Sequence, residues 1–236
     1  MIAMDNAFKK LAIAKLEPLL TEKRQAKLAR ILKDRMTYMS VVLEDIYNPQ
    51  NSNAVLRSCD CFGIQDVHII ENINPHEQRN EVSKGSDKWL SLHYYKEEGI
   101  NNSIECIKAL KDKGIRVVAT KATEDAVALR DFDVRKGPFA LVLGNELHGI
   151  TEEMDSLADE YIHIPMYGFT QSFNLSVAGA LCIHHLRHEL DQQAINWKLS
   201  PDEEVDVHLR WIINTLPNGD FMLKRMFQDY QESIIK

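Results

Sequence analysis

The sequence contains little cysteine, glycine or proline and no long apolar run. It has 4 cysteines, 10 glycines and 7 prolines among 236 residues, and it shows no internal repeat or low-complexity segment. Hydrophobic residues make up 44% and charged residues 27%, which is typical of a globular protein rather than a fibrous or disordered one. No apolar stretch approaches the roughly 20 residues that span a bilayer, so we predict no membrane segment.

The N-terminal stretch MIAMDNAFKKLAIAKLEPLL carries charges throughout, so it contains no apolar centre of a signal peptide. Cysteines in a protein without an export signal predict free thiols in a reducing compartment. We therefore expect a cytoplasmic protein.

Several cofactor and metal motifs are also absent. The glycine spacing matches neither a dinucleotide-binding fingerprint nor a P-loop. Cys59 and Cys61 are too close for the usual zinc pair and have no second pair, which favours core or helix-surface cysteines. His184 and His185 are adjacent, so on a helix they point in different directions and cannot ligate one ion together. The sequence therefore predicts no metal site.

The formal net charge of −7 argues against a protein whose whole surface binds nucleic acid. A local basic face is nevertheless present in TEKRQAKLARILKDRM, residues 21–36. Its apolar residues recur at helical spacing and Thr21 can cap, which predicts one amphipathic helix with a basic outer side. The basic residues are Lys23, Arg24, Lys27, Arg30, Lys33 and Arg35. This pattern alone fits either a solvated helix face or a phosphate-binding surface.

The middle of the chain alternates strand-like and helical patterns. The strand-like runs are residues 39–43, 67–70, 90–95, 115–119, 139–143 and 161–165, and helical patterns cover 51–62, 104–113 and 174–190. Such alternation predicts an α/β fold with a mainly parallel sheet and helices on both faces. We expect an N-terminal helical extension (1–38), an α/β domain (39–190) and a C-terminal helical extension (191–236).

Three polar loops follow predicted strands, at the edge where open parallel sheets bind ligands. They contain NPQNSNAVLRSCDCFG, LVLGNELHGIT and IPMYGFTQSFNLSVAGAL. Asn51 is a candidate cap for the first helix, while Ser172 or Asn174 could cap the last one. Capping explains one of the latter two residues but not both, and an arginine such as Arg57 within an apolar helix is more often packed or ion-paired than catalytic.

Together these three stretches resemble, in order, the signature motifs of the SPOUT 2′-O-ribose RNA methyltransferases, and most closely the TrmH (SpoU) branch, which acts on tRNA. The resemblance covers residues 39–190, and VSKGSDKWL resembles the family's loop after the second strand. It implies a C-terminal trefoil knot, a homodimer with the active site at the interface, and S-adenosyl-L-methionine as methyl donor.

The resemblance also implies roles for individual residues. The matching catalytic positions are Asn51, Arg57, Glu146, Ser172 and Asn174, and the matching cofactor-binding positions are Thr120, Gly144, Ile164, Met166 and Phe173. Arg57 matches the family's proposed activator of the ribose hydroxyl, but a guanidinium stays charged and is a poor base, so a phosphate clamp is the alternative. Glu146 would hold Arg57 or cap the cofactor loop. Phe173 departs from the leucine that relatives often carry between the serine and asparagine.

In this family the helical extensions help to hold RNA, which favours the phosphate-binding interpretation of the basic helix. We expect Lys23, Lys27 and Arg30 to contact tRNA phosphates, with Lys84 and Lys88 as weaker candidates. The expected reaction is 2′-O-methylation of a guanosine in the tRNA D-loop. The alternatives are ribosomal RNA or another tRNA position, a catalytically silent RNA-binding dimer, and a purely structural protein.

Overall fold

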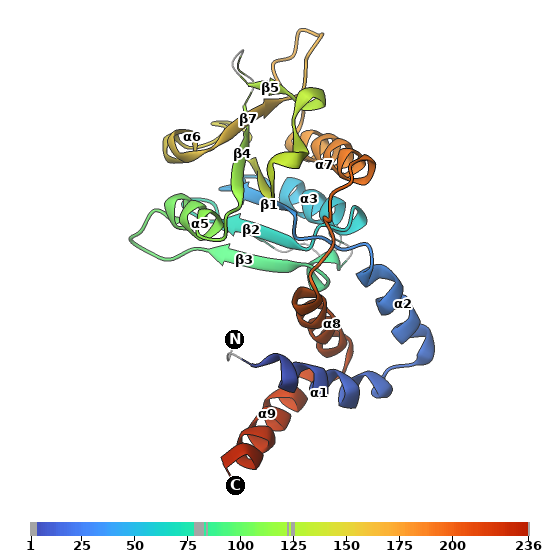
Figure 1. Cartoon of the computed structure of the whole chain (residues 1–236). Helices are drawn as coiled ribbons and strands as arrows, with labels where there is room; N and C mark the ends of the chain where they lie inside the picture. The colour runs from blue at the N-terminus through green and yellow to red at the C-terminus, as the bar shows by residue number, and fades with distance from the viewer. Residues whose placement is uncertain (1–3, 78–82, 84, 122, 124–125, 236) are drawn as a thin grey trace. The chain divides into compact units, whose positions relative to one another are not determined.

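The computed structural model describes residues 4–77, 83, 85–121, 123 and 126–235. The chain forms two compact units, Met36–Trp197 and a second one that joins Met1–Arg35 to Lys198–Lys236. Figure 1 shows the sheet of the first unit and the helices of the second. No helix among the described residues has the length and apolar character needed to cross a membrane.

The unit Met36–Trp197 is built on a parallel sheet. Seven described strands pair in the order β3-β2-β1-β6-β4-β7-β5. Their bounds are β1 Met39–Glu44, β2 Asp66–Ile70, β3 Ser91–Tyr95, β4 Arg116–Thr120, β5 Val127–Ala128, β6 Phe139–Leu143 and β7 Glu160–His163. In the centre, Val41 lies opposite Val67 on one side and Leu141 on the other. The prediction of a mainly parallel sheet is confirmed, although β5 was not predicted.

Helices cover both faces of this sheet, as predicted. On one face, α3 (Pro49–Cys61) and α7 (Leu175–Gln192) pack through Val55, Ile183 and Leu186. On the other face, α5 (Asn102–Lys111) and α6 (Glu152–Leu157) contribute side chains such as Ile107, which pack on Val117 and Val142. Each of these fully buried side chains stabilises the fold by about 1.5–3 kcal/mol. Short 3₁₀ turns, η2 (Ser86–Lys88), η3 (Leu129–Asp131) and η4 (Val134–Lys136), join the larger elements.

The helix starts differ in part from the sequence prediction. α3 is capped by Asn48, whose side-chain oxygen accepts a hydrogen bond from the N–H of Gln50 at 2.9 Å. The prediction that Asn51 caps this helix is therefore wrong, because Pro49 fixes the first helical position and shifts the cap upstream. Asn174 caps α7 by accepting from the N–H of Ser176 at 2.9 Å, as one of the two expected candidates.

The second unit consists of helices from both ends of the chain. They are α1 (Asn6–Leu16), η1 (Glu17–Leu19), α2 (Glu22–Leu32), α8 (Pro201–Thr215) and α9 (Gly219–Ile235). Phe8 of α1 is fully buried, and its ring lies 4.9 Å from that of Phe227. Ser200 and Glu203 form a reciprocal capping box at the start of α8, which satisfies two backbone N–H groups.

The basic helix is shorter than predicted. Thr21 caps α2 by accepting from the N–H of Arg24, as expected, but the helix ends at Leu32 rather than at residue 36. Arg35 therefore lies beyond it, 1% exposed, with its guanidinium 5.1 Å from the centre of the Trp211 ring. The prediction that Arg35 belongs to the basic outer face is wrong, since this side chain packs inside the helical unit.

Candidate active site

A pocket of about 500 Å³ opens at the carboxyl ends of β4, β6 and β7, within the size range of small-molecule sites. Its lining comes from these strand ends, from the loop after β6 and from the segment that leads into α7. The lining residues are Thr120, Lys121, Leu143, Gly144, Asn145, Glu146, Gly149, Ile162, His163, Ile164, Met166, Gln171, Ser172, Phe173, Asn174, Leu175, Ala178 and Cys182.

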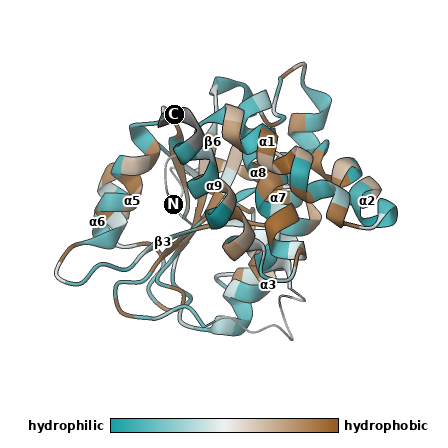
Figure 2. Cartoon of the chain, turned by 90° about the horizontal axis from the view of Figure 1, so that it is seen from below, coloured by the Kyte–Doolittle hydropathy of each residue, from teal (hydrophilic) through white to brown (hydrophobic). Residues whose placement is uncertain are grey.

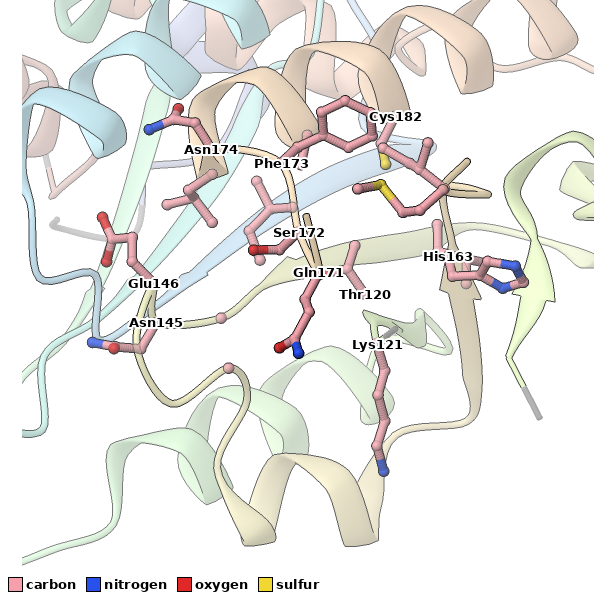
Figure 3. A pocket seen from close by; sticks show the side chains of 18 residues that line it. Thr120, Lys121, Asn145, Glu146, His163, Gln171, Ser172, Phe173, Asn174 and Cys182 are labelled. Atoms are coloured by element: carbon pink, nitrogen blue, oxygen red, sulfur yellow. The ribbon is translucent and has the colours of Figure 1, made fainter. Parts of the chain in front are cut away.

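The pocket has an apolar wall and a polar mouth. Ile162, Ile164, Met166 and Leu175 are among the side chains of the wall. Figure 3 shows Asn145 and Glu146 at one side of the polar part, Lys121 and His163 at the other, and the side chain of Gln171 extending into the space between. Such a division suits a ligand with one flat apolar part and several hydrogen-bonding groups.

The loop after β6 is held in a tight closed shape. Asn145 and Gly149 exchange two backbone hydrogen bonds, of 2.7 and 2.8 Å. Position 144 requires glycine for this closure, because a Cβ there would lie 2.5 Å from the carbonyl carbon of Gly149. Gly149 itself has a φ of +72°, a conformation that favours glycine. The loop is therefore a rigid side of the pocket.

A buried carboxylate anchors the end of this loop. Glu44, at the end of β1, is 1% exposed. Its side chain accepts hydrogen bonds from the hydroxyls of Ser103 at 2.6 Å and Thr151 at 2.7 Å. Burying a charged group is costly unless it is hydrogen-bonded, and these two donors meet that requirement. Since Thr151 caps α6, Glu44 ties the exit of the loop to the centre of the sheet.

Glu146 links three segments of the site. Its carboxylate accepts from the backbone N–H groups of Tyr47 (2.9 Å) and Asn48 (3.2 Å) and from the side-chain amide of Asn51 (2.8 Å). Asn51 in turn accepts a hydrogen bond from the side-chain amide of Asn174 at 3.2 Å. The start of α3, the loop after β6 and the start of α7 are thus joined by one hydrogen-bond network.

Comparison with known proteins shows which family contains these motifs. The model of the SpoU rRNA Methylase family matches residues 38–184, which include the whole of this network. The chain belongs to the SpoU rRNA Methylase family.

Two SpoU relatives cover much of the chain. A tRNA (guanosine(18)-2′-O)-methyltransferase of Borreliella burgdorferi is 33% identical over 218 residues, which are 92% of this chain and 96% of that protein. A protein of the same name from Thermus thermophilus is 36% identical over 72% of this chain and 84% of its own length. Among solved structures, the TrmH/SpoU tRNA modifying enzyme of A. aeolicus aligns with a TM-score of 0.73 and 27% identity, covering 83% of this chain and 98% of that one.

Most residues predicted from the SpoU-like motifs meet in or beside the pocket. The five expected cofactor-binding residues, Thr120, Gly144, Ile164, Met166 and Phe173, all line it. Of the expected catalytic residues, Glu146, Ser172 and Asn174 line it as well. Asn51 does not line the pocket but is bonded to two residues that do.

Arg57 lies apart from this group. It is exposed on α3 and is not among the lining residues. Glu146 does not hold Arg57, because its oxygens are bonded to Tyr47, Asn48 and Asn51 instead. Within the part of the chain that the structure describes, the guanidinium has no hydrogen bond or ion pair, so it is available to an incoming anion.

The predicted RNA-binding residues divide between the two units. Lys23, Lys27 and Arg30 are exposed on α2 in the helical unit, spaced along one helix face. Lys88 is exposed in η2, in the sheet unit, while Lys84 lies outside the described residues.

Ten of the lining residues were not predicted as site residues, among them Lys121 and His163. The ammonium of Lys121 lies 2.8 and 2.9 Å from the carboxylate oxygens of Asp155, and it sits 5.2 Å from the centre of the Tyr161 ring. The Nδ1 of His163 is 2.9 Å from the carbonyl oxygen of Ala126. Lys121 follows β4 and His163 ends β7, both at the ligand-binding edge of the sheet. Their positions at the ends of predicted strands could have identified them as site residues. Among the described residues, no group of three or more histidine, cysteine, aspartate or glutamate side chains could hold a metal ion.

Proposed function

We propose that this chain transfers a methyl group from S-adenosylmethionine to the ribose 2′-hydroxyl of a guanosine in tRNA. The observation that carries the proposal is the convergence of three SpoU motifs on one pocket at the carboxyl edge of the sheet. The relatives from Borreliella burgdorferi and Thermus thermophilus are named for guanosine 18, so position 18 in the D-loop is the proposed target. A tRNA substrate also implies a cytoplasmic enzyme.

The residues of the pocket fit this cofactor. Ile164 and Met166 offer apolar surface to an adenine ring, and the volume of about 500 Å³ is sufficient for a nucleoside with an amino-acid tail. Thr120 donates its hydroxyl to the carbonyl oxygen of Val142 at 2.9 Å, so this side chain supports the wall of the pocket. S-Adenosylmethionine supplies a methyl group on a positively charged sulfur, which is already activated for transfer to a nucleophile.

The protein's main contribution is then to position the ribose oxygen. Asn51, Glu146 and Asn174 hold one another, so we assign them the task of fixing the geometry of the site. Ser172 has an exposed hydroxyl at the pocket and can orient the 2′-oxygen. The guanidinium of Arg57 stays protonated at neutral pH, which favours a phosphate clamp over a general base.

We also propose a knotted chain and a homodimer, as in the SPOUT proteins that the sequence resembles. The knot rests on the resemblance of the three motifs to those of the SPOUT proteins. An apolar stripe supports the dimer: Val177 and Leu181 lie one turn apart on α7 and Phe173 lies just before this helix, and the three are 46%, 42% and 41% exposed. Figure 2 shows the apolar colouring of parts of α7. Exposed apolar residues that gather on one helix face commonly mark a protein interface.

The test is methyl transfer from labelled S-adenosylmethionine to unmodified tRNA and, separately, to ribosomal RNA, with the modified nucleoside mapped. We expect 2′-O-methylguanosine in the tRNA D-loop. Label in ribosomal RNA alone would retain the chemistry but refute the substrate. Cofactor binding without label in either RNA would favour a silent RNA-binding protein.

A further inference from the structure

We propose that Gln171 hydrogen-bonds the nucleoside that enters the pocket and so helps to select the target nucleotide. This inference rests on the proposed function, because it assumes that the incoming ligand is RNA. The argument begins with which polar groups of the site remain available to a ligand.

Most polar side chains at the pocket are already bonded within the protein. Both oxygens of Glu146 are occupied by N–H donors. Asn174 bonds Asn51 through its amide nitrogen and Ser176 through its oxygen. Asn145 accepts from the N–H groups of Leu147 and His148 and donates to the carbonyl oxygen of Asp45. These bonds reduce the hydrogen-bonding capacity that the same groups can offer to a ligand.

Gln171 differs from these residues. Within the described part of the chain, its side-chain amide forms no hydrogen bond, although it lines the pocket and is exposed. Figure 3 shows this side chain reaching into the open space, with Asn145 and Lys121 on opposite sides. Ser172, the next residue, is also exposed and lines the pocket. Gln171 and Ser172 therefore present adjacent, uncommitted polar groups at the mouth.

The chemistry of a carboxamide suits a nucleoside. It offers one acceptor oxygen and two N–H donors side by side, and the edges of unpaired RNA bases present the complementary groups. The apolar wall at Ile164 and Met166 is the proposed place of the cofactor's adenine, which leaves the exposed mouth to the molecule that arrives from solvent. Gln171 is thus assigned to the RNA rather than to the cofactor.

The segment around Gln171 can adjust to such a ligand. No hydrogen bond joins residues 166–173 to other described residues, and Tyr167 and Phe169 in it are 90% and 109% exposed. Because no internal bond holds the segment, a contact between Gln171 and a base can form without breaking part of the fold.

The test compares Gln171→Ala with the wild-type chain and with Gln192→Ala, a matched control at the exposed end of α7. Three quantities are measured: the Kd for S-adenosylmethionine by calorimetry, the Kd for unmodified tRNA by fluorescence anisotropy, and kcat/KM for methyl transfer. Losing one hydrogen bond should weaken tRNA binding and lower kcat/KM about two- to tenfold. The Kd for S-adenosylmethionine should stay the same, and Gln192→Ala should change nothing.

The outcomes separate the inference from the proposed function. A parallel loss of cofactor affinity in Gln171→Ala would assign this side chain to the cofactor and overturn the inference. Unchanged values for all three quantities would show that Gln171 contacts neither ligand. A wild-type chain that binds tRNA but does not methylate it would refute the proposed function, while the tRNA affinities would still decide the role of Gln171.

Discussion

The exposed position of Arg57 bears directly on how the ribose hydroxyl is activated. The pocket is complete without this side chain, and Glu146, which was expected to hold it, is bonded elsewhere. A guanidinium with no partner among the described residues is suited to bind a phosphate of the substrate, and it cannot act as a base while it remains protonated. We therefore expect Arg57 to act in catalysis and not in cofactor binding.

We expect Arg57→Ala to lower methyl transfer by at least about 100-fold, because the substrate phosphate loses its charged partner. The Kd for S-adenosylmethionine, measured by calorimetry, should stay close to the wild-type value. Arg57→Lys retains the charge but not the two-pronged geometry and should recover only part of the rate. A loss of cofactor binding or of folding in Arg57→Ala would instead make this residue structural.

His68 gives the stability of the sheet unit a dependence on pH. It is 3% exposed on β2, and its ring stacks on that of His93 with the centres 4.8 Å apart. Burial, followed by the charge on His93, lowers the pKa of His68 to about 3. The unfolded chain binds a proton near pH 6.5 while the folded chain does not, so stability is complete above that pH and falls as the pH drops toward about 3.

We expect the free energy of unfolding, measured with urea, to fall by about 1 kcal/mol from this residue between pH 7.5 and 5.5. His68→Gln removes the titrating group, so the variant should lose less stability over the same interval. Equal losses in the two proteins would contradict the assignment to His68.

At the scale of single elements, α2 is a cationic helix within an acidic protein. Lys23, Lys27 and Arg30 are exposed on it and have no ion-pair partner among the described residues. Replacing all three with glutamine should weaken tRNA binding and reduce the slope of log K against log salt by up to about 3, because each phosphate contact releases condensed counterions. Filter binding across a salt series measures both quantities.

A control for α2 removes two exposed lysines, Lys108 and Lys113, at and just beyond the C-terminal end of α5. This variant makes the net charge more negative while α2 keeps its sequence. The slope of log K against log salt should stay nearly unchanged. If the control and the α2 variant lost affinity equally, total charge rather than this helix would govern RNA binding.

Elements with a strong local pattern could be predicted from the sequence. The MSVVL run predicts β1 within one residue, since a strand buried on both faces is continuously apolar. β5 has only two residues and no sequence pattern that predicts a strand. Its strand conformation depends on pairing with β7. The true cap of α3 was detectable, since Asn48 precedes a proline that favours the first helical position.

Interactions between distant residues account for most of what the sequence could not predict. Asn51 and Glu146 are 95 positions apart, and no local periodicity reveals that they bond. The family motifs predicted that both residues belong to the site. They did not indicate that Glu146 bonds the residues at the start of α3 and does not bond Arg57. Arg35 was misassigned for the same reason, because its stacking partner Trp211 lies far along the chain.

For the whole molecule, the apolar stripe of Phe173, Val177 and Leu181 makes the oligomeric state testable. Leu181→Glu places a charge on the apolar stripe of the proposed interface and should convert a dimer to a monomer at micromolar concentration in sedimentation equilibrium. Leu157→Glu is a matched control, since this leucine is 37% exposed on α6, which packs on the other face of the sheet. A wild-type monomer under the same conditions would remove the dimer proposal.

The helical unit has a consequence for how the chain acquires its fold on the ribosome. Phe8 of α1 packs against Phe227 and Tyr230 of α9, so a helix synthesised before the sheet unit needs a partner synthesised after it. The whole sheet unit emerges in the interval between them. Domains usually fold in the order of synthesis, but α1 can complete its packing only after α9 has been made. Phe8 therefore lacks its aromatic partners until α9 has been made, and removing either α1 or α9 leaves the other helix without this apolar contact.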